Sequence, residues 1–339
     1  MKKKSAPRTI VEDTLVPHAA FNGALRRIEQ CFAYADSARE PICIALIGET
    51  RTGKSRAMEE FSTRHPSIRN GEGLYIPILR VTTPAKPTVK SLVELMLERM
   101  HDELSESGSE NAKTRRLVKL MDECGTQMVM IDEFHHFVDK GSHKVIHDVA
   151  NWLKTLVDRI RCVLIVAGLP TCQAVLEQNE QLEGRFSAPV MMPRFEWKID
   201  EHREEFIAIL SAFHESMSRY FDLPELDNAD MAFRCYCATG GLMGYLTKFL
   251  RQVVWNALDS GKRKITLGDL AIAHDEAVWA KHGPRGLPNP FTKNFQSTPN
   301  EDLIERIRMI GVPLEQETQK RRRVSPPKKM KVTEVLSTA

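Results

Sequence analysis

The chain has 339 residues and a formal net charge of +3, with 42% hydrophobic and 27% charged residues. This length suggests about two domains, and the balanced composition predicts a packed core and excludes wholesale disorder. No apolar run approaches the roughly 18 residues that a membrane span needs, and no apolar stretch follows the basic N-terminus. We therefore expect neither a membrane anchor nor a secretory signal.

Positive charge is concentrated at the two ends of the chain. Residues 1–10 carry four basic and no acidic residues, and residues 319–331 carry seven basic and no acidic residues. The remainder is therefore mildly acidic. Basic tails on an acidic body are common in chains that touch nucleic acid or an acidic partner, and equally in solvated tails that bind nothing specific.

The seven cysteines are scattered along the chain without a Cys-x-x-Cys pair, and several lie inside apolar runs. We interpret them as reduced structural residues and expect a cytoplasmic protein, because disulfides are rare in that compartment. The spacing of Cys235 and Cys237 does not suit a zinc site.

The first part of the chain alternates apolar strands with amphipathic helices. We expect strands at 42–47, 74–81, 128–133 and 162–168, and helices at 21–35, 54–64, 88–104, 114–123 and 145–160. This alternation predicts an α/β fold with a mainly parallel sheet and right-handed crossovers. Before it, we expect residues 1–16 to be a flexible basic arm.

The second part reads as helical throughout. Helical periods cover 200–220, 228–238, 243–258 and 267–280, and a short amphipathic helix is expected at 301–309. We therefore expect an α/β nucleotide-binding domain at 17–199 and a helical lid domain at 200–282. Residues 283–339, rich in Pro, Gly and basic residues, are expected to be a flexible partner-binding tail.

A phosphate-binding loop lies between the first strand and its helix. The residues Gly48-Glu49-Thr50-Arg51-Thr52-Gly53-Lys54-Ser55 match G-x-x-x-x-G-K-[ST] in full. Such glycines let backbone N–H groups surround phosphates at a helix N-terminus. Lys54 is expected to reach the β- and γ-phosphates and Ser55 to bind Mg²⁺. We assign the whole loop and the following Arg56 to ATP binding.

Two acids follow the apolar run Met128–Ile131. Carboxylates at the end of a parallel strand lie where ligands bind, so we expect Asp132 to hold the Mg²⁺ shell and Glu133 to act as the general base toward water. For the adjacent His135 and His136 we expect a packing or surface role, because neighbours on a regular element point apart.

The combined motifs resemble one family, the TniB/TnsC AAA+ ATPases, which regulate transposition in heteromeric bacterial transposons, including those that carry CRISPR effectors. The resemblance covers about residues 15–295. It rests on the phosphate loop, V-M-I-D-E, V-L-I-V-A-G-L-P, Glu183-Gly-Arg185-Phe186, Ala238-Thr-Gly-Gly-Leu-Met-Gly-Tyr-Leu and Asn289-Pro-Phe291. It implies an AAA+ P-loop fold with a parallel sheet flanked by helices, a small helical lid and basic flexible tails.

The resemblance also implies roles for two arginines. Arg185 occupies the place of the arginine finger, which reaches the γ-phosphate of a neighbouring subunit, and such a cation is worth about 10³–10⁵ in rate. Arg194 is the competing candidate for this role.

Two departures from the family pattern concern the sensors of the γ-phosphate. The fourth strand ends in Gly168-Leu169-Pro170 without the usual Asn or Thr, and Tyr245 replaces the lid arginine, with Lys248 one turn away. A missing lid cation weakens the coupling between hydrolysis and lid movement. We therefore expect slow hydrolysis, with ATP acting mainly as an assembly signal.

Duplex DNA is the expected partner, gripped without sequence preference through phosphate contacts. Lys86 and Lys90 flank a turn at a helix start beside Thr82, Thr83 and Thr88, and lysines and hydroxyls there suit phosphates. The resemblance places duplex-facing lysines in this region. Asn289, Phe291, Phe295 and the basic tail are expected to dock a partner or to bind DNA.

We therefore expect an ATPase with ATP and Mg²⁺ that oligomerises as a ring or filament on target duplex DNA. It would recruit or activate a transposase alongside a target-selection protein, and hydrolysis would disassemble it. Two alternatives stay open at this stage. One is another AAA+ DNA protein such as a helicase loader or initiator, and the other is a nucleotide-gated scaffold with negligible hydrolysis.

Overall fold

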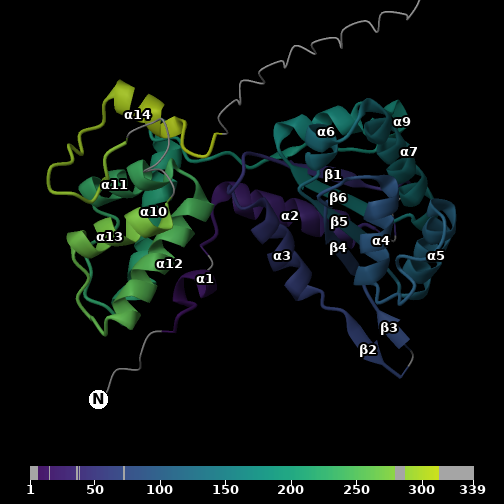
Figure 1. Ribbon diagram of the computed structural model, residues 1–339, viewed down its shortest axis with the longest axis horizontal. Coiled ribbons are helices and arrows are strands. Elements are labelled where there is room, and N and C mark those ends of the chain that lie inside the picture. Colours follow the sequence, from purple (N-terminus) through teal and green to yellow (C-terminus); the bar gives the residue numbers. More distant parts are fainter. Residues whose placement is uncertain are drawn as a thin grey trace, which may run out of the picture.

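The computed structural model describes residues 7–14, 16–35, 37, 39–71, 73–278 and 287–312. Figure 1 shows two lobes. We call residues 16–192 the sheet lobe, and residues 7–14, 193–278 and 287–312 the helical lobe. The first six residues and the basic segment 319–331 lie outside the described residues, as do the predictions made for them. Among the described helices, none combines the length and the apolar character of a membrane span.

Five strands form the centre of the sheet lobe, paired in parallel in the order β4-β5-β6-β1-β7. They are β1 (Cys43–Ile47), β4 (Ile78–Thr82), β5 (Met128–Asp132), β6 (Val163–Gly168) and β7 (Val190–Met191). All residues of β1, β5 and β6 are buried, as expected for strands covered on both faces. The predicted parallel α/β fold is confirmed.

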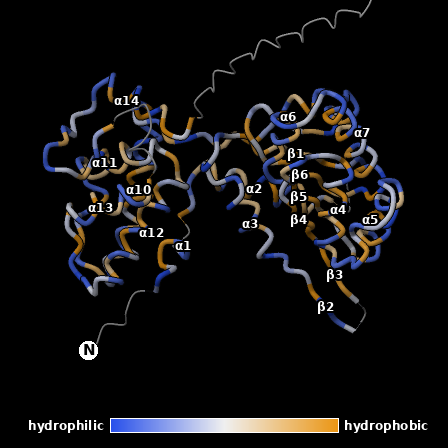
Figure 2. Tube along the Cα trace, viewed as in Figure 1, coloured by the Kyte–Doolittle hydropathy of each residue, from blue (hydrophilic) through white to orange (hydrophobic). Residues whose placement is uncertain are grey.

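Helices cover both faces of this sheet, and alternate strand residues face the two resulting cores. One core contains α2 (Ala19–Ala33) and α3 (Lys54–Arg64), and the other contains α4 (Val89–Arg99), α5 (Glu110–Glu123) and α7 (His143–Ile160). Short α6 (His136–Lys140), η1 (Pro170–Cys172), α8 (Gln173–Leu176) and α9 (Glu180–Glu183) complete this lobe. In Figure 2 the hydrophobic colours concentrate on the strands and the inner helix faces.

The second predicted strand, 74–81, is two elements. β3 (Gly73–Tyr75) pairs antiparallel with β2 (Ile68–Asn70), and β4 begins only at Ile78 after a break at Pro77. Proline lacks the N–H group that a strand donates to its neighbour and has a fixed φ, so it divides the apolar run. The β2–β3 hairpin projects from the sheet lobe in Figure 1.

The helical lobe has its own core. Its helices are α10 (Asp200–Ser218), α11 (Ala229–Thr239), α12 (Met243–Asp259), α13 (Leu267–Ala277) and α14 (Glu301–Arg308). They also share that core with α1 (Ile10–Asp13), whose Ile10 and Val11 are buried there. The expectation of a flexible arm over 1–16 is therefore wrong for these residues, because two adjacent apolar side chains anchor them to α10 and α12.

The Asn-Pro-Phe segment also belongs to this core. Phe291 is 1% exposed and stacks on Phe249 at a centroid distance of 4.9 Å, and Phe295 lies beside the guanidinium of Arg234. Asn289 donates to the carbonyl of Ala271 at 2.8 Å. The docking role expected for these three residues is therefore not supported, because their side chains close the helical lobe.

All seven cysteines are free and buried. Burial raises the pKa of the Cys43 and Cys162 thiols to about 12, so they stay protonated at neutral pH. Their structural interpretation agrees with this environment.

Candidate ATP-binding site

The carboxyl edge of the sheet brings the predicted phosphate and metal residues together. The register places Thr82 of β4 opposite Asp132 of β5, and Ile47 of β1 opposite Gly168 of β6. The phosphate loop follows β1 directly and therefore lies at the same edge as Asp132 and Glu133. Such an edge is where open α/β sheets bind ligands.

Two glycines of the loop are required by its shape. A Cβ on Gly48 would lie 2.1 Å from the carbonyl oxygen of Met192, so no side chain fits there. Gly53 has a φ of 102° and precedes the first turn of α3, in a conformation that glycine adopts most readily. The loop thus delivers the N-terminus of α3, with its free N–H groups, to the edge of the sheet.

Lys54 is buried at the centre of the loop. Its Nζ donates to the carbonyl oxygens of Gly48 at 2.8 Å and Glu49 at 2.5 Å. Burial lowers the pKa of this ammonium, while the nearby carboxylates of Glu133 and Asp132 oppose that shift. The positive charge is therefore held inside the loop, where a phosphate would take over the two carbonyl contacts.

Asp132 and Glu133 have different environments. Asp132 is 4% exposed, its Oδ1 accepts from the backbone N–H of Glu133, and its carbonyl accepts from both the N–H and the hydroxyl of Thr83. The Glu133 side chain is 37% exposed and lines the adjoining cavity. Its φ of 54° is uncommon for a residue with a side chain, and such strain is concentrated at functional sites.

A cavity of about 330 Å³ adjoins the loop and is lined by both lobes. The phosphate loop and the start of α3 supply one wall through Thr50, Arg51, Gly53, Lys54, Ser55 and Arg56. The rest is mainly apolar and comes from the N-terminal segment (Val11, Val16, His18, Phe21) and the helical lobe (Phe213, Met243, Gly244, Thr247). This second wall is not predictable from the sequence, because its residues are far apart in the chain and carry no motif.

The helical lobe touches the phosphate loop directly. The N–H of Gly244, at the start of α12, donates to the carbonyl of Arg51 at 2.9 Å, and a Cβ on Gly244 would lie 2.8 Å from the Cβ of Arg51. The Arg51 guanidinium lies 4.6 Å from the ring centroid of Tyr245. Tyr245 stands at the position where the resemblance implies an arginine. Its ring thus contacts a cation that belongs to the phosphate loop.

Arg194 joins three regions of the chain. It is 4% exposed, and its guanidinium pairs through two nitrogens with the carboxylate of Glu49. The same group donates to the carbonyls of Gly240 at 3.2 Å, Arg308 at 2.9 Å and Ile310 at 3.0 Å. A residue so enclosed is a structural link between the loop, α11 and the end of α14, which does not suit the competing role of an arginine finger.

Arg185 lies at the opposite edge of the sheet from the phosphate loop. Its carbonyl accepts from the N–H of Cys43, the first residue of β1. Its guanidinium pairs with Asp158 on α7, with Nε–Oδ1 at 2.9 Å, and donates to the carbonyl of Gln181 at 2.8 Å. Within one chain Arg185 therefore does not approach the phosphate loop.

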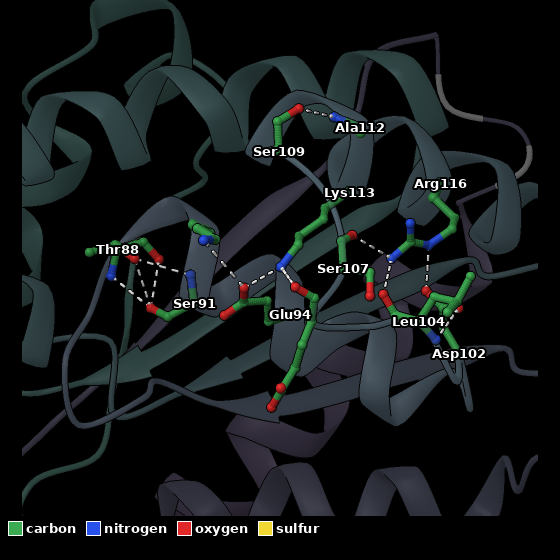
Figure 3. Close-up of polar contacts among 12 residues, drawn as sticks. Thr88, Ser91, Glu94, Asp102, Leu104, Ser107, Ser109, Ala112, Lys113 and Arg116 are labelled. Carbon is green, nitrogen blue, oxygen red and sulfur yellow. Dashed lines mark hydrogen bonds and ion pairs between the residues drawn. The ribbon is translucent and has the colours of Figure 1, made fainter.

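Lys86 and Lys90 are exposed around the start of α4. Thr88 caps this helix in a reciprocal box with Ser91, whose hydroxyl also donates to the carbonyl of Lys86 at 2.9 Å. Figure 3 shows this cap beside Glu94, which pairs with the buried Lys113 of α5 and lies 4.0 Å from the Nζ of Lys90. Thr83 is buried against Asp132, so it is not a surface contact.

The loop between α4 and α5 is held by the same group of residues. Lys113 donates to the carbonyl of Glu106 at 2.6 Å, and Arg116 binds the Asp102 carboxylate and the Leu104 carbonyl, each at 2.5 Å (Figure 3). The start of α4 is held separately by the cap of Thr88 and Ser91, and the side chains of Lys86 and Lys90 extend from this capped backbone.

Comparisons with solved structures identify the fold. Cdc6p from Pyrobaculum aerophilum matches with a TM-score of 0.60 and 12% identity, over 84% of this chain and 75% of that chain. ORC2 of Aeropyrum pernix, in its ADPNP–ADP complexes, matches with 0.57 and 14%, over 83% and 75%. ORC1 of Aeropyrum pernix, in complex with DNA, matches with 0.55 and 15%, over 79% and 69%.

At these identities the likeness establishes the fold alone, and it is the AAA+ fold that the motifs predict. The sequence has no significant match among curated proteins. The model of one family, described as bacterial TniB protein, matches residues 7–198, which is more than half of the chain. The chain therefore belongs to the TniB family.

Proposed function

We propose that this chain is an ATP-dependent, DNA-binding AAA+ regulator of transposition in the bacterial cytoplasm. It would assemble on target duplex DNA and recruit or activate a transposase, together with a target-selection protein. One observation carries the proposal: the phosphate loop and the Asp132-Glu133 pair share one edge of the sheet, and the loop and Glu133 line a cavity to which both lobes contribute. Membership of the TniB family supports the link to transposition.

The donor atoms at this edge suit ATP with Mg²⁺. The hydroxyl of Ser55 and the carboxylate of Asp132 are hard oxygen ligands, which Mg²⁺ prefers. Bound there, the ion would neutralise charge on the β- and γ-phosphates. The Lys54 ammonium would hold the same phosphates, and Glu133 would accept the proton of the attacking water. The apolar wall with Phe213 and Met243 offers a surface for the base.

Slow hydrolysis remains part of the proposal. β6 ends at Gly168 without a polar sensor, and the loop cation of Arg51 is engaged by Tyr245. Among the described lid residues that line the cavity, none is a cation, so loss of the γ-phosphate would break no cation contact with the lid. Turnover below about 10 s⁻¹, the typical enzyme median, is therefore expected.

A second subunit would complete the site. Arg185 sits at the far edge of the sheet, so only a neighbouring chain could bring it to the γ-phosphate. Assembly as a ring or filament would release it from Asp158 and aim it across the interface. This arrangement links ATP hydrolysis to oligomer formation.

Duplex DNA would be held through Lys86 and Lys90. Both side chains are exposed on a fixed helix start, and lysines at such a position bind phosphates without reading bases. The ORC1 relative in the same fold was solved in complex with DNA, which makes a DNA-binding role for this architecture reasonable.

Co-sedimentation with duplex DNA tests the proposal. The wild type should form large DNA-bound assemblies with ATP, and fewer with ADP or without nucleotide. Lys54→Ala should lose the ATP dependence. Double replacement of Lys86 and Lys90 by Ala should weaken DNA binding at every salt concentration. The slope of log affinity against log salt concentration should become shallower by about two released ions. Binding that ignores nucleotide and both lysines would refute the proposed DNA-gripping surface.

A further inference from the structure

Two histidines converge on the proposed general base. The Nε2 atoms of His135 and His136 lie 3.4 Å and 3.9 Å from the same oxygen, Oε2 of Glu133. Among the described residues, these three form a group whose ligand atoms all lie within 4.8 Å of one another. His135 is almost fully buried, whereas His136 and Glu133 are partly open toward the surface.

The local backbone explains why adjacent histidines face one carboxylate. Glu133 has a positive φ, and the N–H of Phe134 donates to the carbonyl of Ala167 at 2.8 Å, which turns the chain sharply after β5. His135 occupies the N-cap position of α6 and His136 is its first residue, with ring centroids 4.7 Å apart. The expectation that neighbouring rings point apart assumed a regular element, and it fails at this turn.

The geometry resembles a vacant ligand set for a transition metal. Zinc bonds of about 2.0–2.1 Å to nitrogen and oxygen place tetrahedral ligand atoms about 3.3–3.5 Å apart. The two nitrogen–oxygen separations of 3.4 Å and 3.9 Å are close to that requirement.

We propose that Glu133, His135 and His136 form a binding site for a divalent transition-metal ion of the zinc class, separate from the Mg²⁺ site. Imidazole nitrogens select such ions, whereas Mg²⁺ prefers the oxygens of Ser55 and Asp132. Three protein ligands leave one position for water. The second part of this proposal rests on the proposed ATPase function. The ion occupies the oxygen of Glu133 and thereby stops hydrolysis while ATP stays bound.

The surroundings predict a reversible site. The Nδ1 atoms of both histidines are buried without a hydrogen-bond partner among the described residues. Metal-binding histidines normally donate this second N–H to an acceptor, and loss of that partner weakens metal affinity about 10- to 100-fold. The ion should therefore bind and leave with changing zinc concentration, as a regulatory ligand does.

Zinc binding to the nucleotide-free, full-length protein tests the site directly. Free zinc is set by competition with a chromophoric chelator, and the variants are His136→Gln, Glu133→Gln and, as control, His143→Gln at an exposed histidine on α7. The wild type and the control should bind one zinc ion, and the other two variants should bind it at least tenfold more weakly. Equal binding by all four proteins, or no binding by the wild type, would overturn the proposal.

The second part is tested by the ratio of ATP turnover with and without saturating buffered zinc, at excess Mg²⁺. Zinc should lower the turnover of the wild type at least tenfold and that of His136→Gln less than twofold. The nucleotide affinity of both proteins should be unchanged by zinc. Zinc binding without any effect on turnover would overturn the claim that the ion engages Glu133. A protein without ATPase activity would instead refute the proposed function, and the chelator assay would still decide the site.

Discussion

The sheet lobe and the helical lobe are built from the chain in different ways. The sheet lobe is one continuous stretch, and its phosphate loop, Asp132 and Glu133 follow directly from strands that the sequence predicts. The helical lobe combines α1, the helices after Asp200 and the segment around Phe291 in one core. The comparison teaches that the chemical groups lie in the locally encoded lobe, while the lobe assembled over long range adds a wall to the cavity.

This contrast predicts that substitutions of the charged groups at the proposed site change the rate, and that substitutions in the helical lobe change stability or nucleotide affinity. The following experiments test that division, from the largest expected effect to the smallest.

Arg185→Ala should lower the ATP turnover of the DNA-bound assembly about 10³-fold or more, because a trans arginine stabilises the transferred phosphoryl group. Arg159→Ala, at an exposed arginine on α7, is the matched control and should be neutral. Mixing Arg185→Ala with Glu133→Gln subunits should restore part of the turnover, since some interfaces then hold one intact residue of each kind. No restoration would contradict a role in trans.

Glu133→Gln should lower turnover about 10²- to 10⁴-fold, because the amide cannot accept the proton of the attacking water. Nucleotide affinity, measured by a fluorescent ATP analogue, should stay near the wild-type value. Glu177→Gln, at an exposed position after α8, controls for the loss of one charge. Unchanged turnover in Glu133→Gln would favour the nucleotide-gated scaffold over an ATPase.

Phe291→Ala should destabilise the helical lobe by about 3–5 kcal/mol, because it removes a buried ring stacked on Phe249. Denaturant unfolding followed by circular dichroism measures the change. Phe137→Ala, equally buried in the sheet lobe, should cost a similar amount but act on that lobe. If the Phe291 variant kept wild-type stability, the Asn-Pro-Phe segment could still serve as a docking site.

Met243→Ala should weaken ATP binding about fivefold to tenfold and leave the rate at saturating ATP unchanged, because it removes apolar surface from the wall opposite the phosphate loop. Equilibrium binding and steady-state kinetics together check this split. Met309→Ala, at an exposed methionine after α14, should have no effect. A lower rate at saturating ATP would show that the helical lobe contributes to the chemical step.

Much of the site was predictable because it depends on short-range rules. The phosphate loop lies between a buried strand and a helix, and Asp132 ends a strand, so register alone brings them together. The helix starts were readable for the same reason, since Thr88 and Thr266 cap α4 and α13 with their own side chains. The strand over 74–81 was misread because apolar content alone does not show the break at Pro77.

The remaining features depend on partners that no spacing rule identifies. Nothing around Arg194 shows that it meets Glu49 on one side and the end of α14 on the other. The burial of Ile10, Val11 and Phe291 likewise follows from helices that lie far away in the sequence. His135 and His136 face one oxygen only because the backbone turns at Glu133.

The amino-acid sequence by itself determined the parallel sheet, the phosphate loop and the two acids, because alternating burial and the geometry of a strand followed by a helix act within a few residues. Only the tertiary structure decided which side chains line the cavity, that Arg185 lies away from the phosphate loop of its own chain, and that Glu133 is flanked by two imidazoles. These depend on packing between distant segments, where a side chain's role is set by what is folded against it.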